Sequence, residues 1–146
     1  MKLKISGATW HKHVLLHAAG IYYAKRLGYF NKKKVKIELS LVPSMRTKHH
    51  YRGAAWQASK DLFYIHLDSG LKPISLLRCL AHEMIHVKQW ISGKMKDLHG
   101  QRFRVQWGKR MYRPEKLAYD KHPWEIQAHR LEKILYKNFT LAWDAR

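Results

Sequence analysis

The 146-residue sequence predicts an α+β fold in which a helix near the N-terminus is followed by a small sheet and two further helices. Apolar residues recur at helical spacing over residues 9–29, 73–92 and 123–138. Between the first two of these segments, residues 34–42 alternate apolar and polar side chains, as a half-buried strand does. The length suits one domain, so we expect residues 1–146 to share a single core.

The sheet is expected to have three strands and to be mostly antiparallel. The strand at 34–42 ends at a proline and is followed by a basic loop at 43–50. Residues 53–59 and 61–67 are predicted to be the next two strands, and a turn of Asp, Ser and Gly then leads into the second long helix. Further along, residues 103–112 predict a short strand or a hairpin that a glycine interrupts.

The helix at 73–92 contains the most informative motif in the chain. Pro73 suits its first turn, where the missing N–H costs nothing. Apolar residues surround the helix axis, which predicts burial. His82, Glu83 and His86 spell H-E-x-x-H within it. Positions i and i+4 lie on one face of a helix, so two imidazoles at this spacing can bind one metal ion.

The chemistry of these residue types favours zinc. Imidazole nitrogens are good ligands for Zn²⁺, and a catalytic zinc site has three protein ligands with one position left for water. Zinc lowers the pKa of such a water toward about 7. Glu83 directly follows the first histidine, so it can accept a proton from this water and pass it to the leaving amine of a peptide bond. The alternative is a core helix that merely contains two histidines.

A third ligand must come from elsewhere in the chain, and two residues qualify. Glu125 stands in the first turn of the last predicted helix, where Ala128 would allow close packing against the metal helix; alternatively, Glu125 only satisfies free N–H groups at the helix start. His99 is the second candidate, because nearby glycines would let the chain fold back. His129, at i+4 from Glu125, is expected to orient a ligand or to stabilise an oxyanion, and Tyr119 is another candidate for the second role.

The sequence is strongly basic, with 29 Lys or Arg residues against 10 acidic ones and a net charge of +19. Residues 1–60 hold 13 of these cations and a single acid, Glu38. The run at 32–34 and the cluster at 46–52 make the N-terminal portion cationic, and aromatic residues are interspersed there. Such a surface attracts DNA or another polyanion, and its rings can stack on unpaired bases. The alternative is a solvated basic face with ordinary core aromatics.

The hydropathy and the cysteine content of the sequence indicate where in the cell the protein is located. The chain has no apolar run of 18 or more residues, so no membrane span is expected, and no signal peptide is evident. The single cysteine, Cys79, excludes an intramolecular disulfide framework and fits a reducing compartment, so we expect a cytoplasmic location. Cys79 lies near the histidine-bearing face of its helix, where we expect a small buried thiol rather than a ligand.

The segment LAHEMIHVKQW at 80–90, followed by WGK at 107–109 and PWEIQA at 123–128, resembles a group of small zinc metallopeptidases encoded in tailed-phage genomes. This resemblance implies a zincin-like domain with Zn²⁺ as its cofactor. It also implies that Glu125 is the third ligand, as in gluzincins, whose downstream E-x-x-A/S helix carries the glutamate. Gln127 departs from the acidic residue expected there. A phage-encoded chain would act in the host cytoplasm.

A second resemblance rests on His99-Gly100 followed by Phe103. These residues resemble the SprT-like proteases, which combine H-E-x-x-H with a later H-G-x-x-F/W. That resemblance implies His99 as the third ligand and a DNA-associated protease, with which the basic charge agrees. The segment at 123–128 matches over more residues, which favours Glu125.

Three classes of function follow, of which the third, suggested by the phage resemblance and the charge, is a virion or assembly component that binds an acidic partner. The first is a zinc-dependent peptidase acting on proteins or peptides, including proteins bound to nucleic acid. In this case an extended peptide could pair with residues 53–59 as an added strand, because small residues there let a second chain approach. The second is a non-enzymatic nucleic-acid-binding protein that zinc stabilises. Glu83 favours the first class, since a structural zinc site is closed by four ligands and needs no base.

Overall fold

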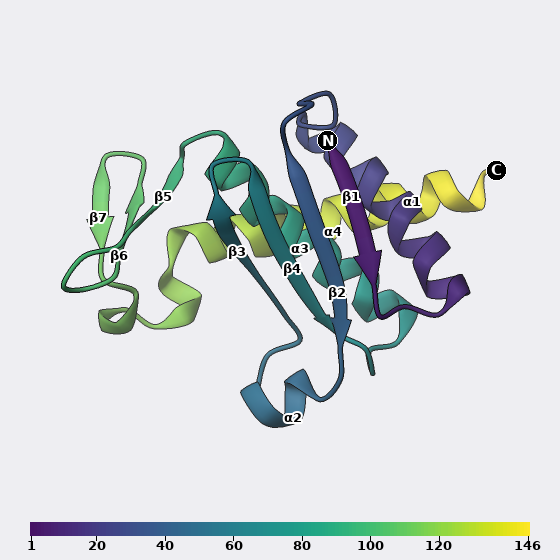
Figure 1. The fold of residues 1–146 in the computed structure, drawn as a ribbon, viewed down its shortest axis with the longest axis horizontal. Helices are drawn as coiled ribbons and strands as arrows, with labels where there is room; N and C mark the ends of the chain where they lie inside the picture. Colours follow the sequence, from purple (N-terminus) through teal and green to yellow (C-terminus); the bar gives the residue numbers. More distant parts are fainter.

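The computed structural model describes residues 1–146 apart from the side chain of His49. Over these residues the chain forms four α-helices, a four-stranded sheet and a three-stranded sheet (Figure 1). The helices are α1 (Trp10–Leu27), α2 (Met45–His49), α3 (Pro73–Ile91) and α4 (Pro123–Asp144). The strands are β1 (Lys2–Ser6), β2 (Lys36–Val42), β3 (Gly53–Ser59), β4 (Leu62–Asp68), β5 (Met95–Leu98), β6 (Arg104–Trp107) and β7 (Arg110–Tyr112). Two 3₁₀ turns, Pro114–Lys116 and Tyr119–Lys121, precede α4.

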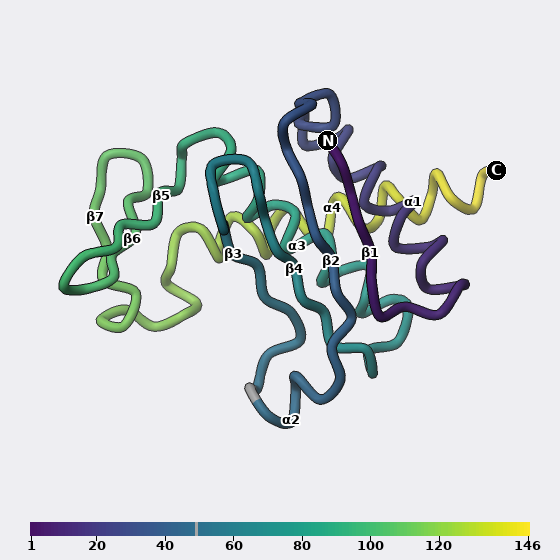
Figure 2. Tube along the Cα trace, viewed as in Figure 1, coloured from purple at the N-terminus to yellow at the C-terminus, as the bar shows by residue number. Residues whose placement is uncertain are grey.

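The main sheet has the strand order β1-β2-β4-β3 and is mixed, so the expectation of three mostly antiparallel strands is wrong. β1 pairs with β2, and β2 with β4, in parallel, while β3 and β4 pair antiparallel. The expected sheet lacked β1. Because α1 crosses from β1 to β2, the two strands run in the same direction, as in other β–α–β units. The trace in Figure 2 shows β4 between β2 and β3, although β3 precedes β4 in sequence.

One face of the main sheet packs against helices. α1 and α3 lie on this face, and α4 packs against α3 and α1 (Figure 1). Ile37, Leu39 and Phe63 point toward the helices and are almost completely buried, and fully burying such a side chain contributes roughly 1.5–3 kcal/mol. Residues at the alternating positions are only partly buried or exposed. The opposite face of the sheet, toward the viewer in Figure 1, carries no helix across its strands.

α3 begins at Pro73, as predicted, and ends at Ile91, one residue before the expected end. Its buried residues surround the helix axis, which confirms the expected burial, and they include His82, Glu83 and His86. The helix lies between the main sheet and α4. The H-E-x-x-H motif therefore sits in the interior of the molecule, where its side chains must find polar partners or a metal ion.

α4 is longer than expected, since it continues past residue 138 to Asp144. No glycine or proline interrupts the added turns, and Phe139 packs its ring at 5.6 Å from Tyr22 and 5.8 Å from Tyr23, both in α1. Apolar contacts with α1 thus stabilise the C-terminal part of the helix. None of the described helices has both the length and the apolar character that a membrane crossing needs.

The remaining elements lie beside the main sheet. β6 and β7 form the expected hairpin, and Gly108 takes a positive φ of 61° at their turn. β5 was not expected; its Met95 packs with Val105 and Trp124 in a small second cluster. α2 occupies part of the expected basic loop. The side chain of His49, which belongs to the expected basic cluster, lies outside the described residues.

Candidate metal centre

His82 and His86 project from consecutive turns of α3 toward the same point. Their Nε2 atoms are 3.1 Å apart, and their ring centroids are 4.7 Å apart at an interplanar angle of 82°. Both side chains are buried. The i, i+4 spacing on a regular helix produces this arrangement directly, because it stacks the two side chains on one face.

α4 brings Glu125 to the two histidines. Glu125 Oε2 lies 2.9 Å from His82 Nε2, and Glu125 Oε1 lies 3.1 Å from His86 Nε2. α4 starts at Pro123, so Glu125 stands in its first turn, as expected. Ala128, one turn later, is completely buried. Its small side chain permits the close contact between α3 and α4 that brings the carboxylate within reach of the imidazoles.

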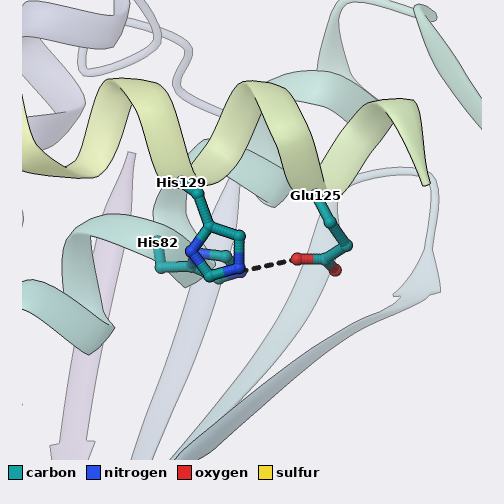
Figure 3. Close-up of side chains that lie close together, drawn as sticks. All are labelled: His82, Glu125 and His129. Carbon is teal, nitrogen blue, oxygen red and sulfur yellow. Dashed lines mark hydrogen bonds and ion pairs between the residues drawn. The ribbon is translucent and has the colours of Figure 1, made fainter. Parts of the chain in front are cut away.

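His129 approaches the same point from the next turn of α4. One ligand atom from each of His82, Glu125 and His129 lies within 4.8 Å of the others, and these three residues form a group that can hold a metal ion (Figure 3). The ring of His129 is 4.6 Å from that of His82, centroid to centroid. Its side chain is about half exposed, unlike those of His82 and Glu125. His129 is therefore the most accessible member of the group.

The outer ring nitrogen of each buried histidine has its own partner. The Nδ1–H of His82 donates to Glu132 Oε2 at 2.7 Å, and the Nδ1–H of His86 donates to Gln89 Oε1 at 2.7 Å. These bonds direct the Nε2 atom of each ring toward Glu125. Such partners are typical of metal-binding histidines, which usually donate their second N–H to a carboxylate or carbonyl oxygen.

Gln89 links α3 to the start of α4. While its Oε1 accepts from His86, its Nε2 donates to the backbone oxygen of Trp124 at 3.0 Å and to Gln127 Oε1 at 2.9 Å. The buried Gln89 amide therefore has hydrogen-bond partners for its oxygen and for its NH₂ group. Gln127, the residue that departs from the phage resemblance, accepts one of these bonds. A carboxylate in its place could accept the same N–H.

The charges around His82 favour its protonated form in the metal-free protein. Burial lowers the pKa of the ring, but hydrogen bonds to Glu125 and Glu132 outweigh it and raise the pKa to about 10. For Glu125, burial raises the pKa, while hydrogen bonds from His82 and His86 hold it well below its usual range. The raised pKa of His82 and the lowered pKa of Glu125 both favour a protonated imidazole beside an ionised carboxylate. A proton thus occupies the space between His82 and Glu125 when no metal is bound.

Glu83 lies on the sheet-facing side of the centre. It is buried, and burial raises the pKa of its carboxyl above the usual range, although His86 and His82 act in the opposite direction. A Cβ atom at Gly53, in β3, would lie 3.2 Å from Glu83 Oε1. The absence of a side chain at Gly53 therefore leaves room for the Glu83 carboxylate beside the strand.

Tyr119 reaches the centre from the second 3₁₀ turn. Its hydroxyl donates to Glu125 Oε2 at 2.6 Å. Burial is the main cause that raises the pKa of this hydroxyl far above its usual range, and the bond to Glu125 adds to the effect. Tyr119 therefore keeps its proton near neutral pH and acts as a hydrogen-bond donor.

A cleft follows β3 past these residues. Its central hollow, of about 530 Å³, is bordered by Gly53 to Ala55 on one side and by His82, Glu83, His86 and Glu125 on the other. A second hollow of about 290 Å³ adjoins it toward Arg52 and Arg78. A third, of about 480 Å³, adjoins it on the side of Trp56 and Phe103. The site thus lies in the middle of a groove along the unpaired edge of the sheet.

Two other sequence candidates, His99 and Cys79, are not among the described residues whose donor atoms meet at this centre. His99 is exposed, its ring is 5.4 Å from that of Phe103, and it borders the third hollow. Cys79 lines the second hollow and is only partly buried, and burial raises the pKa of its thiol to about 11. The thiol is therefore protonated near neutral pH in the metal-free protein. Of the two candidates for the third ligand, the structure brings Glu125 to the histidines.

Sequence reasoning missed Gln89 and Glu132. Gln89 follows His86 by three residues, a spacing at which helical side chains meet. Glu132 follows Glu125 by seven residues and thus lies on the same face of α4 two turns later. Both signals are visible in the sequence, but each occurs by chance in many helices. Comparison with protein-family models, curated proteins and solved structures found no match to the chain.

Proposed function

We propose that this chain is a zinc-dependent metallopeptidase in which His82, His86 and Glu125 bind the metal and Glu83 is the general base. The observation that carries the proposal is the convergence of two imidazole Nε2 atoms and one carboxylate at separations of 2.9–3.1 Å. Glu83 and the groove along β3 lie directly beside these atoms. A core helix with two incidental histidines would need none of these features.

The donor set fits zinc. Ligands of a tetrahedral zinc ion, with bonds of about 2.0–2.2 Å, lie roughly 3.3–3.6 Å from one another. The donor atoms of His82, His86 and Glu125 are a few tenths of an ångström closer than this. Two imidazoles and one carboxylate also form the ligand set of several zinc peptidases. Glu132 and Gln89 orient the rings as such a site requires.

When bound, zinc polarises a carbonyl oxygen and lowers the pKa of water toward neutrality. Glu83 accepts a proton from the attacking water on its carboxylate and then delivers it to the leaving amine. Its burial, which raises its pKa, makes it a better proton acceptor than an exposed glutamate. The Tyr119 hydroxyl and the His129 ring can donate hydrogen bonds to the negatively charged oxygen of the tetrahedral intermediate.

The groove suits an extended peptide. β3 is the last strand of the main sheet, and on its side away from β4 no described strand pairs with it. Backbone N–H and C=O groups on such an edge can pair with an added strand. Residues 53–55 of this edge are Gly-Ala-Ala, which lets a second chain approach closely. A peptide bound there would pass its backbone in front of Glu83 and the histidines.

His129 supports a second candidate function. If it joined His82, His86 and Glu125, four protein ligands would close the site, as in structural zinc centres. The protein would then be a non-enzymatic binding protein. His129→Ala separates the two cases. If the protein is a peptidase with three ligands, the variant keeps its zinc and loses turnover. If the site is structural and has four ligands, the variant loses its zinc.

The peptidase is tested by Glu83→Gln, with Glu115→Gln as the matched control because Glu115 is exposed on the first 3₁₀ turn. We expect Glu83→Gln to retain one zinc per chain and to lose at least 100-fold in the hydrolysis of a mixed peptide library, the usual scale for a general base. Glu115→Gln should cleave as the unmodified protein does. Cleavage by zinc-loaded Glu83→Gln at the unmodified rate would refute the proposal.

A further inference from the structure

The uncovered face of the main sheet carries a cluster of aromatic rings outside the metal centre. Trp56 in β3 stands opposite Tyr64 in β4, and the two ring centroids are 5.4 Å apart. The ring of His66 is 4.7 Å from that of Trp56. Phe63 and Ile65, which alternate with these β4 residues, are completely buried on the helix side. The cluster therefore faces away from the core, and Trp56 is 40% exposed.

Lysines from the neighbouring strands extend this face. The pairing of the strands places Lys4, Glu38, Tyr64 and Trp56 in one row across the sheet. Two residues earlier in β1 and β2, Lys2 and Lys36 stand opposite each other on the same face of the sheet. All three lysines are exposed, and Glu38 is the single acid within residues 1–60. Aromatic rings thus stand beside a net positive charge.

We propose that this open face, made of Lys2, Lys4, Lys36, Trp56 and Tyr64, binds single-stranded nucleic acid. The lysines would contact phosphates, and the two rings would stack on unpaired bases. One row, from β1 to β3, spans three strand intervals of about 4.8 Å, or roughly 14 Å. The lysine and the ring at its ends can therefore contact successive parts of one strand. The net charge of +19 favours a polyanion over a neutral partner, and the two rings favour a polyanion with unpaired bases over an acidic protein.

This proposal does not rest on the peptidase. The lysines and rings lie on the sheet face, whereas the metal centre lies between α3 and α4. β3 belongs to both, because Trp56 also borders the third hollow of the groove. A bound strand would consequently hold its associated proteins next to the groove. Glu83→Gln should bind nucleic acid as the unmodified protein does.

The test is fluorescence anisotropy with a labelled oligothymidine, an oligouridine and a DNA duplex of the same length. Loss of one base–aromatic stack typically weakens binding roughly five- to a hundred-fold, and we expect this for Trp56→Ala and Tyr64→Ala. Trp56→Phe should keep most of the affinity, since it keeps a stacking ring. Trp10→Ala is the matched control, because Trp10 is 73% exposed but lies on α1. It should bind as the unmodified protein does.

Salt dependence tests the lysines. Replacing Lys4 and Lys36 together by alanine should reduce the slope of log affinity against log salt by about 1.4, the value for two single-strand phosphate contacts. The matched control replaces two exposed lysines of α4, Lys133 and Lys137. Three results would each overturn the proposal. The first is an equal loss of affinity in Trp10→Ala and Trp56→Ala, and the second is tighter binding of the duplex than of the single strands. The third is no binding of either single strand at physiological salt.

Discussion

At the scale of single residues, the chemistry of the centre depends on where protons reside. In the metal-free protein both ring nitrogens of His82 face carboxylates, Glu132 at 2.7 Å and Glu125 at 2.9 Å. This explains why the imidazolium form is favoured despite burial. The proton on Nε2 stands where a metal ion would bind. Metal and proton must therefore compete for the same nitrogen.

Zinc uptake should consequently release protons. The pKa of His82 is about 10 in the metal-free protein, and the hydrogen bond to Glu125 also raises the pKa of His86 despite its burial, so zinc binding near neutral pH must displace at least one proton. Zinc affinity therefore rises with pH, at least tenfold per unit, until the pH passes the pKa of His82. Calorimetric titration with zinc in two buffers of different ionisation enthalpy measures the proton count. A pH-independent affinity would contradict the assignment of His82 as a ligand.

The H-E-x-x-H residues can be predicted from the sequence more easily than the residues that contact them. His82, Glu83 and His86 could be predicted because their relation depends only on the period of one helix. Glu125 could be proposed from its place in a helix start, but its contact with His82 spans 43 residues of sequence. Glu132 was missed, since its bond to His82 depends on how α3 and α4 cross. Such a crossing is a property of packing that periodicity does not express.

At the scale of elements, the contact between α3 and α4 assembles the centre. α3 supplies His82 and His86, and α4 supplies Glu125. Gln89 joins the two helices by donating to Trp124 and Gln127. Ala128 is completely buried at this contact. The separation of the two helices, rather than the conformation of one loop, therefore determines whether the three donor atoms meet.

Ala128→Leu tests this contact. The larger side chain should move α4 away from α3, cost about 1–3 kcal/mol of unfolding free energy, and weaken zinc binding at least tenfold because Glu125 moves with the helix. Urea unfolding and a competitive zinc chelator measure the two effects. Ala142→Leu, at an exposed position of the same helix, is the control. If Ala128→Leu binds zinc as tightly as the control does, helix separation does not control the site.

The helices were easier to predict than the sheet. α1 and α3 follow from apolar periodicity and from terminal residues such as Pro73 and Gly28, which caps α1 with a positive φ of 86°. The five residues of β1, KLKIS, do alternate polar and apolar side chains, but so short a run also occurs by chance outside strands. Its omission also hid the crossover through α1. The parallel direction of β1, β2 and β4 could not be inferred without it.

At the scale of the whole molecule, a bound metal would connect α3 to the start of α4, and with them the two apolar clusters that these helices contact. α3 belongs to the core on the sheet, whereas the start of α4 contacts the smaller cluster around Met95 and Val105. The centre lies where these two clusters approach each other. Metal binding to the folded state alone should therefore stabilise the whole chain and not a local loop.

Metal removal should lower the melting temperature. A ligand at 100 times its dissociation constant stabilises the folded state by about 2.7 kcal/mol, which for a chain of this size is roughly 5–11 °C. Scanning calorimetry with zinc and with a chelator measures the difference. Glu125→Ala should show a much smaller shift, because it lacks one ligand. Equal melting temperatures with and without zinc in the unmodified protein would show that the folded state does not bind the metal specifically.

The most direct test of the proposed centre is the zinc content of Glu125→Ala and His99→Ala, measured side by side with that of the unmodified protein. Glu125 lies 2.9 Å from His82 Nε2, while His99 is exposed and stacks near Phe103. We predict that the unmodified protein and His99→Ala each bind about one zinc per chain, as expected for a single catalytic site, and that Glu125→Ala loses it. Loss of zinc from His99→Ala, with full retention by Glu125→Ala, would contradict the proposed ligand set.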